Sequence, residues 1–246
     1  MKLRWVVKNI VFLSVVFFST LFAGGTVIFF NWVGISLTWR KRVELLWART
    51  IVWASGIKLQ WESSPFPEGN YIFISNHESY LDIPVLVCVL HKFSPRFVAK
   101  SSLFNIPIFG WALKAVEHIP LHRENRKKGL RDLQRAIEAS QRGESVLVFP
   151  EGTRNPHMKE LLEFQVGAFI LAIRSSCPIV PVVLHGTGEV LPRGTFLLSP
   201  SKNRVVVKVL SPIFIGNMHI KQREELKDRL WNIMQKEFLE IKDATR

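Results

Sequence analysis

The feature that most constrains this chain is a long uncharged segment near its N-terminus. No charged residue occurs between Lys8 and Arg40, and residues 9–30 are almost entirely apolar. As a straight helix, residues 9–30 would span roughly 33 Å, about the thickness of the hydrocarbon core of a bilayer. This length and composition predict that the segment lies in a membrane.

Basic residues lie on both sides of the apolar segment. The first 61 residues hold eight Lys and Arg, one acid (Glu44) and six of the eight tryptophans, which are typical of the headgroup level. Because both flanks are basic, the positive-inside rule favours neither orientation. Gly24-Gly25 is a point where the segment can bend, and residues 36–55 have the pattern of an amphipathic helix. We therefore expect residues 1–61 to form a membrane anchor, either an apolar helix or a helical hairpin, plus the amphipathic helix.

Charge and cysteine content restrict the partners and sites. The chain has 246 residues and a formal net charge of +13, which favours an anionic partner. A nucleic-acid binder and a membrane-bound basic scaffold are both possible readings, but no nucleic-acid-binding motif is visible, so anionic membrane lipids are the expected partner. Cys88 and Cys177 lie far apart, which excludes a cysteine zinc site or a disulfide framework. We expect neither a metal nor nucleic acid.

Residues 62–246 alternate between short apolar runs and longer amphipathic segments, which predicts one α/β domain with a largely parallel or mixed sheet flanked by helices. The predicted strands are Tyr71–Ser75, Arg96–Ala99, Ser145–Phe149, Ile179–Leu184 and Arg204–Leu210. The predicted helices are Pro84–His91, Ile106–Ala115, Lys127–Arg142, Gly167–Ser175 and His219–Lys242.

The first candidate site follows the first of these strands. His77 and Asp82 are separated by four residues, and Pro84 favours the start of a helix just after them. We expect both side chains in the strand-to-helix turn, where the carboxylate reaches the imidazole. A histidine held by an aspartate is the general-base half of a catalytic triad. Since no serine or cysteine nucleophile accompanies it, the pair would activate a hydroxyl of the substrate; a histidine that merely caps the helix is the alternative.

The second candidate site follows the strand Ser145–Phe149. Glu151, Gly152, Thr153 and Arg154 combine close backbone approach, a hydroxyl and a planar guanidinium suited to a phosphate, with Glu151 placed to orient Arg154. A turn with a surface ion pair is the alternative. Lys100 and Arg123 each end an apolar run and are candidates for the same cleft.

Together these segments resemble one family. His77 with Asp82, the segment from Lys100 to Gly110, Arg123, the run Glu151–Arg154 and the strand from Ile179 occur in the order and spacing of the glycerolipid acyltransferases, most closely the bacterial 1-acylglycerol-3-phosphate acyltransferases. The resemblance covers about residues 65–215. The first motif and the Phe-Pro-Glu-Gly-Thr-Arg motif are specific when they occur together.

The resemblance implies an activity and a role for each residue. His77 would be the general base, Asp82 would orient it, and the sn-2 hydroxyl of lysophosphatidate would attack the thioester of acyl-CoA or acyl-acyl-carrier protein, giving phosphatidate without a cofactor. Glu151, Gly152, Thr153 and Arg154, with Arg123 and Lys100, would hold the glycerol phosphate. The enzyme would lie on the inner or plasma membrane, monotopic or single-pass, with its catalytic domain on the cytoplasmic face.

The chain departs from the family pattern at three positions near the expected headgroup pocket. They are Gln165 in place of a basic residue, Asn155 in place of a serine, and His122 in place of an acid. Acylation of glycerol 3-phosphate or of another lysolipid therefore stays open beside acylation of lysophosphatidate.

Overall fold

The uncharged segment forms a single continuous helix. The structure, a computed structural model, describes residues 2–245, and its first helix, α1 (Lys2–Trp32), runs through Gly24-Gly25 without a break. The bend expected there is absent, and Gly24 instead allows a close helix contact. A Cβ at Gly24 would lie 3.0 Å from Ile108 Cγ2, so the missing side chain lets α1 approach the helix α4 (Phe109–Ala115) closely.

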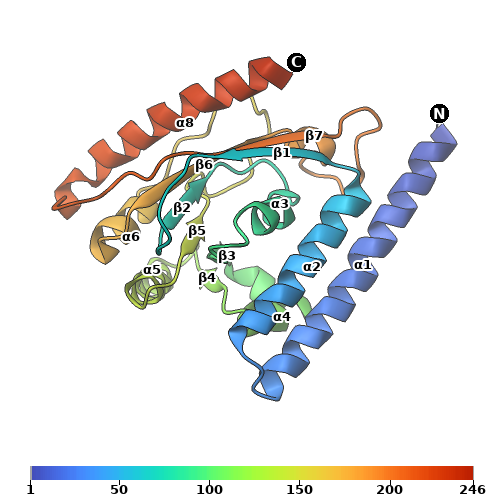
Figure 1. The fold of residues 1–246 in the computed structure, drawn as a ribbon, viewed down its shortest axis with the longest axis horizontal. Helices are drawn as coiled ribbons and strands as arrows, with labels where there is room; N and C mark the ends of the chain where they lie inside the picture. The colour runs from blue at the N-terminus through green and yellow to red at the C-terminus, as the bar shows by residue number, and fades with distance from the viewer. Residues whose placement is uncertain (1, 246) are drawn as a thin grey trace.

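The chain reverses direction immediately after α1. Gly34 takes a positive φ of 76°, which glycine adopts without strain, and α2 (Leu37–Ser55) then runs back alongside α1. Figure 1 shows the two helices as a long antiparallel arm beside the sheet. We call residues 2–55 the helical arm. A helix is therefore present where the sequence predicted one at 36–55.

Within residues 2–245 the chain forms a seven-stranded sheet with the order β1-β7-β6-β2-β5-β3-β4. The strands are β1 (Lys58–Ser63), β2 (Ile72–Ser75), β3 (Arg96–Lys100), β4 (Ile119–Leu121), β5 (Val146–Val148), β6 (Ile179–His185) and β7 (Arg204–Val209). Strands β6, β2, β5, β3 and β4 are parallel, whereas β7 is antiparallel to β6 and parallel to β1. The predicted mixed sheet is confirmed.

Helices cover both faces of this sheet. The remaining helices are α3 (Asp82–Val89), α5 (Arg126–Gln141), α6 (Gly167–Ser175), α7 (Thr187–Val190) and α8 (Arg223–Thr245), with short 3₁₀ turns at Ser101–Asn105 and Ile220–Gln222. Helices α5, α6 and α8 pack on one face, whereas α3 and the helical arm pack on the other (Figure 1).

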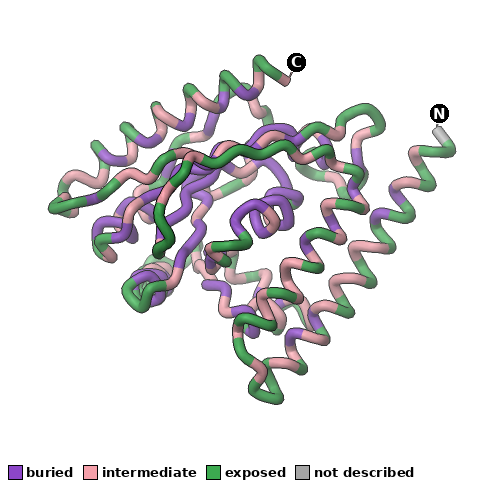
Figure 2. Tube along the Cα trace, viewed as in Figure 1, coloured by how far each residue is buried: buried purple, intermediate pink, exposed green. Residues whose placement is uncertain are grey.

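The core consists of two apolar layers, one on each side of the central strands. On β2, Ile72 and Ile74 enter the layer under α6 and α8, and Phe73 between them enters the layer under α3, as the alternation of a strand dictates. Figure 2 shows that burial is concentrated in the central strands and α3. Because β2 is buried on both faces, the loop that follows it starts from a fixed point.

The helical arm is part of the same packing. Phe12 of α1 and Ala48 and Ile51 of α2 are buried in the layer that also holds Val85 and Leu86 of α3. Residues Leu3–Trp32 are long and apolar enough to cross a membrane, although only 17% of their most apolar window is buried. The expected boundary between residues 61 and 62 falls inside β1, so the sheet already begins at Lys58.

Candidate active site

The turn after β2 brings His77 and Asp82 together. Asn76 fixes the start of this turn, because its amide donates to Leu184 O (2.8 Å) and its Oδ1 accepts from Leu184 N (2.9 Å) on β6. Asp82 is the first residue of α3, and its Oδ2 lies 2.6 Å from His77 Nδ1. The contact predicted from the four-residue spacing is therefore present.

Several donors surround the Asp82 carboxylate, which is completely buried. Oδ2 accepts from the backbone N–H groups of Glu78 (2.7 Å) and Ser79 (2.9 Å) as well as from His77, and the Thr187 hydroxyl contacts Oδ1. Four donors are thus directed at the two oxygens of this carboxylate. When His77 donates to Oδ2 from Nδ1, its Nε2 has the free lone pair.

The His77 ring lies at the boundary between the protein and solvent. One face stacks on Phe149 at the end of β5, with 4.1 Å between the ring centroids. The His77 side chain is 18% exposed, and no hydrogen bond to Nε2 occurs among the described residues. The backbone of Asn155 donates to His77 O (2.6 Å), which ties the loops after β2 and β5 together. Nε2 is thus available as a proton acceptor.

Glu151 is buried between these two loops. Its Oε1 accepts from the backbone N–H of His77 (3.4 Å), and its Oε2 is buried without a hydrogen-bonded partner among the described residues. Burial, together with the charges of Asp82 and Glu78, raises the pKa of Glu151 from its ordinary 4.5 to about 9. Glu151 is therefore neutral at pH 7, chiefly because its carboxyl is buried away from water.

This neutral carboxyl predicts a pH-dependent stability. The folded protein keeps a proton on Glu151 that the unfolded chain loses above about pH 4.5, so the free energy of unfolding falls as the pH rises from 4.5 to about 9. The part of this decrease that Glu151 causes is up to about 1.4 kcal/mol per pH unit. Glu151→Gln is expected to abolish that part. Denaturant unfolding of both proteins in detergent at pH 5 to 8 measures the difference. Parallel pH profiles would mean that Glu151 is ionised in the folded protein.

Arg154 does not lie on Glu151 as the sequence suggested. Its guanidinium lies over the ring of Tyr80, 3.8 Å from the centroid, and Tyr80 in turn stacks on Phe196. Stacking leaves the N–H groups in the guanidinium plane free to bind an anion. Tyr80 therefore supports Arg154, a role that the sequence alone did not suggest.

The other predicted phosphate-binding residues differ in position. Gly152 has φ of +70°, which favours glycine, and a Cβ there would lie 3.9 Å from Arg123 Nη1, so Arg123 reaches this loop. Thr153 is exposed beside it. Burial lowers the pKa of the Arg123 guanidinium, although the group stays a cation at neutral pH. Lys100 pairs with exposed Glu124 (3.3 Å), so its membership of the site stays a prediction.

Two of the three departures from the family pattern, Asn155 and His122, have structural roles here. The Asn155 side chain accepts from the backbone N–H groups of His157 and Met158 and donates to Glu160 O, which closes the loop after Arg154. The side chain of His122 bonds to buried Asp132 (2.7 Å). The bond from Gln165 to Pro150 O comes from the backbone and does not depend on the side chain.

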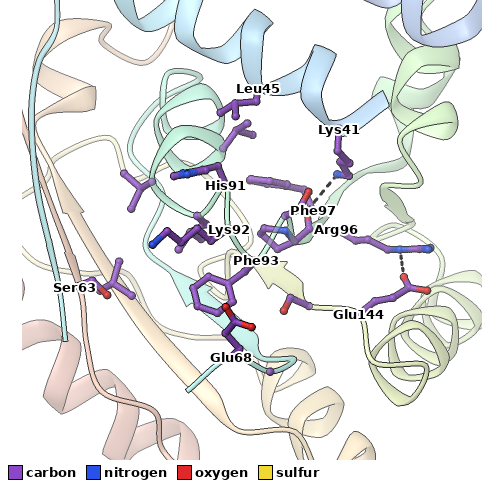
Figure 3. A pocket seen from close by; sticks show the side chains of 18 of the residues that line it. Lys41, Leu45, Ser63, Glu68, His91, Lys92, Phe93, Arg96, Phe97 and Glu144 are labelled. Atoms are coloured by element: carbon purple, nitrogen blue, oxygen red, sulfur yellow. Dashed lines mark hydrogen bonds and ion pairs between the residues drawn. The ribbon is translucent and has the colours of Figure 1, made fainter. Parts of the chain in front are cut away.

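Two cavities lie at different distances from this site. A large cavity of about 1090 Å³ lies between α2, the end of α3 and the amino ends of β3 and β5, where Arg96 pairs with Glu144 (Figure 3). His77 and Glu151 follow the carboxyl ends of β2 and β5, so this cavity is at the opposite edge of the sheet. A smaller apolar cavity between α1, α2 and α4 is lined by Ile83, the neighbour of Asp82.

Sequence reasoning missed the residues that surround the carboxylate from the other side. Glu78 lies within hydrogen-bond distance of His185 and of Thr187, and Thr187 also contacts Asp82. The signal for Glu78 was its place between His77 and Asp82. The signal for Thr187 was its place between two glycines directly after a fully apolar strand.

The chain is similar in sequence to known acyltransferases. The model of the family described as Acyltransferase matches residues 58–185. A chloroplastic 1-acyl-sn-glycerol-3-phosphate acyltransferase of Brassica napus is 35% identical over 147 residues, which are 59% of this chain and 42% of that protein. A 1-acyl-sn-glycerol-3-phosphate acyltransferase of Pseudomonas aeruginosa is 29% identical over 198 residues, which are 77% of this chain and 75% of that protein. The matched segment thus spans less than half of the plant relative.

The fold has a match among solved structures. The crystal structure of the 1-acyl-sn-glycerophosphate acyltransferase of Thermotoga maritima superimposes with a TM-score of 0.81 at 24% sequence identity, covering 98% of this chain and 97% of that one. The match includes the helical arm as well as the sheet. At this identity, the likeness shows the fold.

Proposed function

This chain belongs to the Acyltransferase family, and we propose that it transfers a fatty acyl group from a thioester donor to the sn-2 hydroxyl of 1-acylglycerol 3-phosphate, giving phosphatidate. The observation that carries the proposal is the His77–Asp82 pair, whose free Nε2 lies beside the loop that carries Arg154 and that Arg123 reaches from the end of β4. A base and a phosphate-binding loop at one sheet edge suit an acceptor that bears both a hydroxyl and a phosphate.

The chemistry is a direct transfer. His77 Nε2 takes the proton of the sn-2 hydroxyl while its oxygen attacks the thioester carbonyl, and Asp82 stabilises the resulting imidazolium. The tetrahedral intermediate collapses, the C–S bond breaks, and the leaving sulfur takes the proton from His77. The products are the ester and a free thiol. The thioester donor, acyl-CoA or acyl-acyl-carrier protein, is a co-substrate, and the proposal includes neither a resident cofactor nor a metal.

The structure offers a place for the acceptor phosphate and one for an acyl chain. We propose that Arg154, Arg123 and the backbone at Gly152, with Glu151, Thr153 and Lys100 around them, hold the acceptor phosphate. The cavity lined by Ile83 and Gly24 begins at the residue that follows Asp82, and its apolar lining suits a hydrocarbon chain.

The proposal is tested with the purified full-length chain in mixed micelles. Lysophosphatidate and glycerol 3-phosphate are each offered with acyl-CoA and with acyl-acyl-carrier protein, and the lipid products are separated and quantified. Phosphatidate formed from lysophosphatidate is the expected result. Acylation of glycerol 3-phosphate alone, or of neither acceptor, would contradict the proposal.

We propose further that the helical arm lies in one leaflet, on the cytoplasmic side of the membrane, and does not cross the bilayer. Near the start of α1, Trp5 donates to Leu198 O (2.7 Å) and Asn9 accepts from Leu198 N (2.6 Å). Farther along α1, Gly24 packs on Ile108. These two contacts lie roughly 25 Å apart along the helix, and a helix that crossed the bilayer could not touch one aqueous domain at both.

The exposed aromatic side chains of α1 make this attachment testable. Phe18 and Phe22 are one helical turn apart and 66% and 79% exposed. Replacing both by asparagine is expected to lower binding to phosphatidylethanolamine–phosphatidylglycerol vesicles at least about tenfold, because each buried side chain contributes about 1.5–3 kcal/mol. Vesicle flotation measures the change. Phe214→Asn is the control, since Phe214 is equally exposed but lies outside the arm; equal losses in both variants would contradict the proposal.

A further inference from the structure

A second buried histidine–carboxylate pair lies directly behind the first. His185 Nδ1 is 3.0 Å from Glu78 Oε1, and both residues are buried. Glu78 Oε2 accepts from the backbone N–H groups of Gly186 (3.0 Å) and Gly188 (3.1 Å). Since Glu78 is the neighbour of His77 in the chain, these bonds fix the loop after β2 to the turn after β6.

The turn from Gly186 to Gly188 is closely packed on both sides. Gly186 has φ of +102°, and a Cβ there would lie 2.3 Å from Arg204 O. A Cβ at Gly188 would lie 2.2 Å from Met158 Sδ and 3.1 Å from Glu78 Cβ. Both glycines are needed for this packing, so the residue between them is held in one place.

That residue, Thr187, lies between the two carboxylates. Its hydroxyl contacts Asp82 Oδ1 and lies 3.2 Å from Glu78 Oε2. A hydroxyl has one hydrogen to donate. Glu78 already accepts hydrogen bonds from two backbone N–H groups and from His185. Among the described residues, Asp82 Oδ1 has Thr187 as its one donor. The hydrogen therefore belongs to Asp82.

We propose that Thr187 is a positioning residue for the reaction, which holds Asp82 Oδ1 so that Oδ2 faces His77 Nδ1. The bond pins one carboxylate oxygen, and the backbone of Glu78 and Ser79 pins the other. The carboxylate then cannot rotate away when His77 takes up a proton. This inference rests on the proposed role of His77 and adds a residue that touches neither substrate.

The test separates the hydroxyl of Thr187 from its shape. Thr187→Val keeps the branched side chain and removes the donor, whereas Thr187→Ser keeps the donor and removes a methyl group. Each full-length variant is assayed in mixed micelles for kcat and for the KM of both substrates, with thermal unfolding as the check on folding. We expect Thr187→Val to lower kcat at least tenfold with both KM values within twofold of wild type, and Thr187→Ser to keep most of the activity.

Other outcomes would overturn the inference. A Thr187→Val variant with near-normal kcat would show that the hydroxyl does not act through Asp82, and equal losses in the valine and serine variants would show that shape matters instead. If Thr187→Val does not fold, Thr187→Ala is compared with Thr187→Ser by the same criteria. A wild-type protein inactive on lysophosphatidate would contradict the proposed function alone, and the comparison would then use whichever acceptor it acylates.

Discussion

Replacing His77 by alanine is expected to remove acyl transfer, lowering kcat by at least roughly 10²–10⁴-fold, because it deletes the proton acceptor. Asp82→Asn is expected to cost less than His77→Ala but still orders of magnitude, since the amide lacks the charge that stabilises the imidazolium. Initial rates in mixed micelles measure both. His91→Ala serves as the control, because His91 is exposed at the other edge of the sheet and bonds to Cys88 O.

Trapping with hydroxylamine tests whether the acyl group passes directly to the acceptor. We expect no acyl-enzyme to be trapped, because the acceptor hydroxyl itself attacks the thioester. An isolable acyl-protein, or a His77→Ala variant with near-normal turnover, would contradict the mechanism.

Arg154→Lys is expected to raise the KM for lysophosphatidate roughly 10- to 150-fold, since a hydrogen bond to a charged group contributes about 1.5–3 kcal/mol. The lysine keeps the charge but loses the planar fork and its stacking on Tyr80. The KM for the thioester should change much less. Steady-state kinetics with each substrate varied in turn measure both constants.

The matched control for Arg154→Lys is Arg131→Lys, the same chemical change on the exposed face of α5. A raised KM for the thioester with an unchanged KM for the acceptor would assign the loop to the donor. An equal effect of the two substitutions would mean that net charge, and not the position of Arg154, determines binding.

Local patterns predicted most of the fold. Strands β2, β5 and β6 are apolar runs between turn residues, and Pro84 marks the start of α3, so the elements that carry the base were visible in the sequence. Strand β1 was missed because it is largely exposed, and its pairing with β7 joins segments far apart in the chain. Strand β4 has three residues including Pro120, too few for a periodic signal.

The candidate site was predictable only in part, for a physical reason. The contact between His77 and Asp82 follows from a local spacing, and the structure contains it. The burial of Glu151 arises from loops that come from different parts of the chain, so its neutral state was not visible. The stacking of Arg154 on Tyr80 and the contact of Thr187 with Asp82 likewise join distant segments. Sequence spacing indicates which residues take part, and tertiary packing determines what each one does.

Under the proposed function, the short connection between the helical arm and the sheet determines how the site meets a lipid acceptor. Helix α2 ends at Ser55 and β1 begins at Lys58, so Gly56 and Ile57 alone join them, and α1 also contacts the domain at Trp5 and at Gly24. The arm and the sheet must therefore move as one rigid body relative to a membrane. On a membrane, the histidine would stay at a constant depth, and a lipid acceptor would reach it by lateral diffusion within the leaflet.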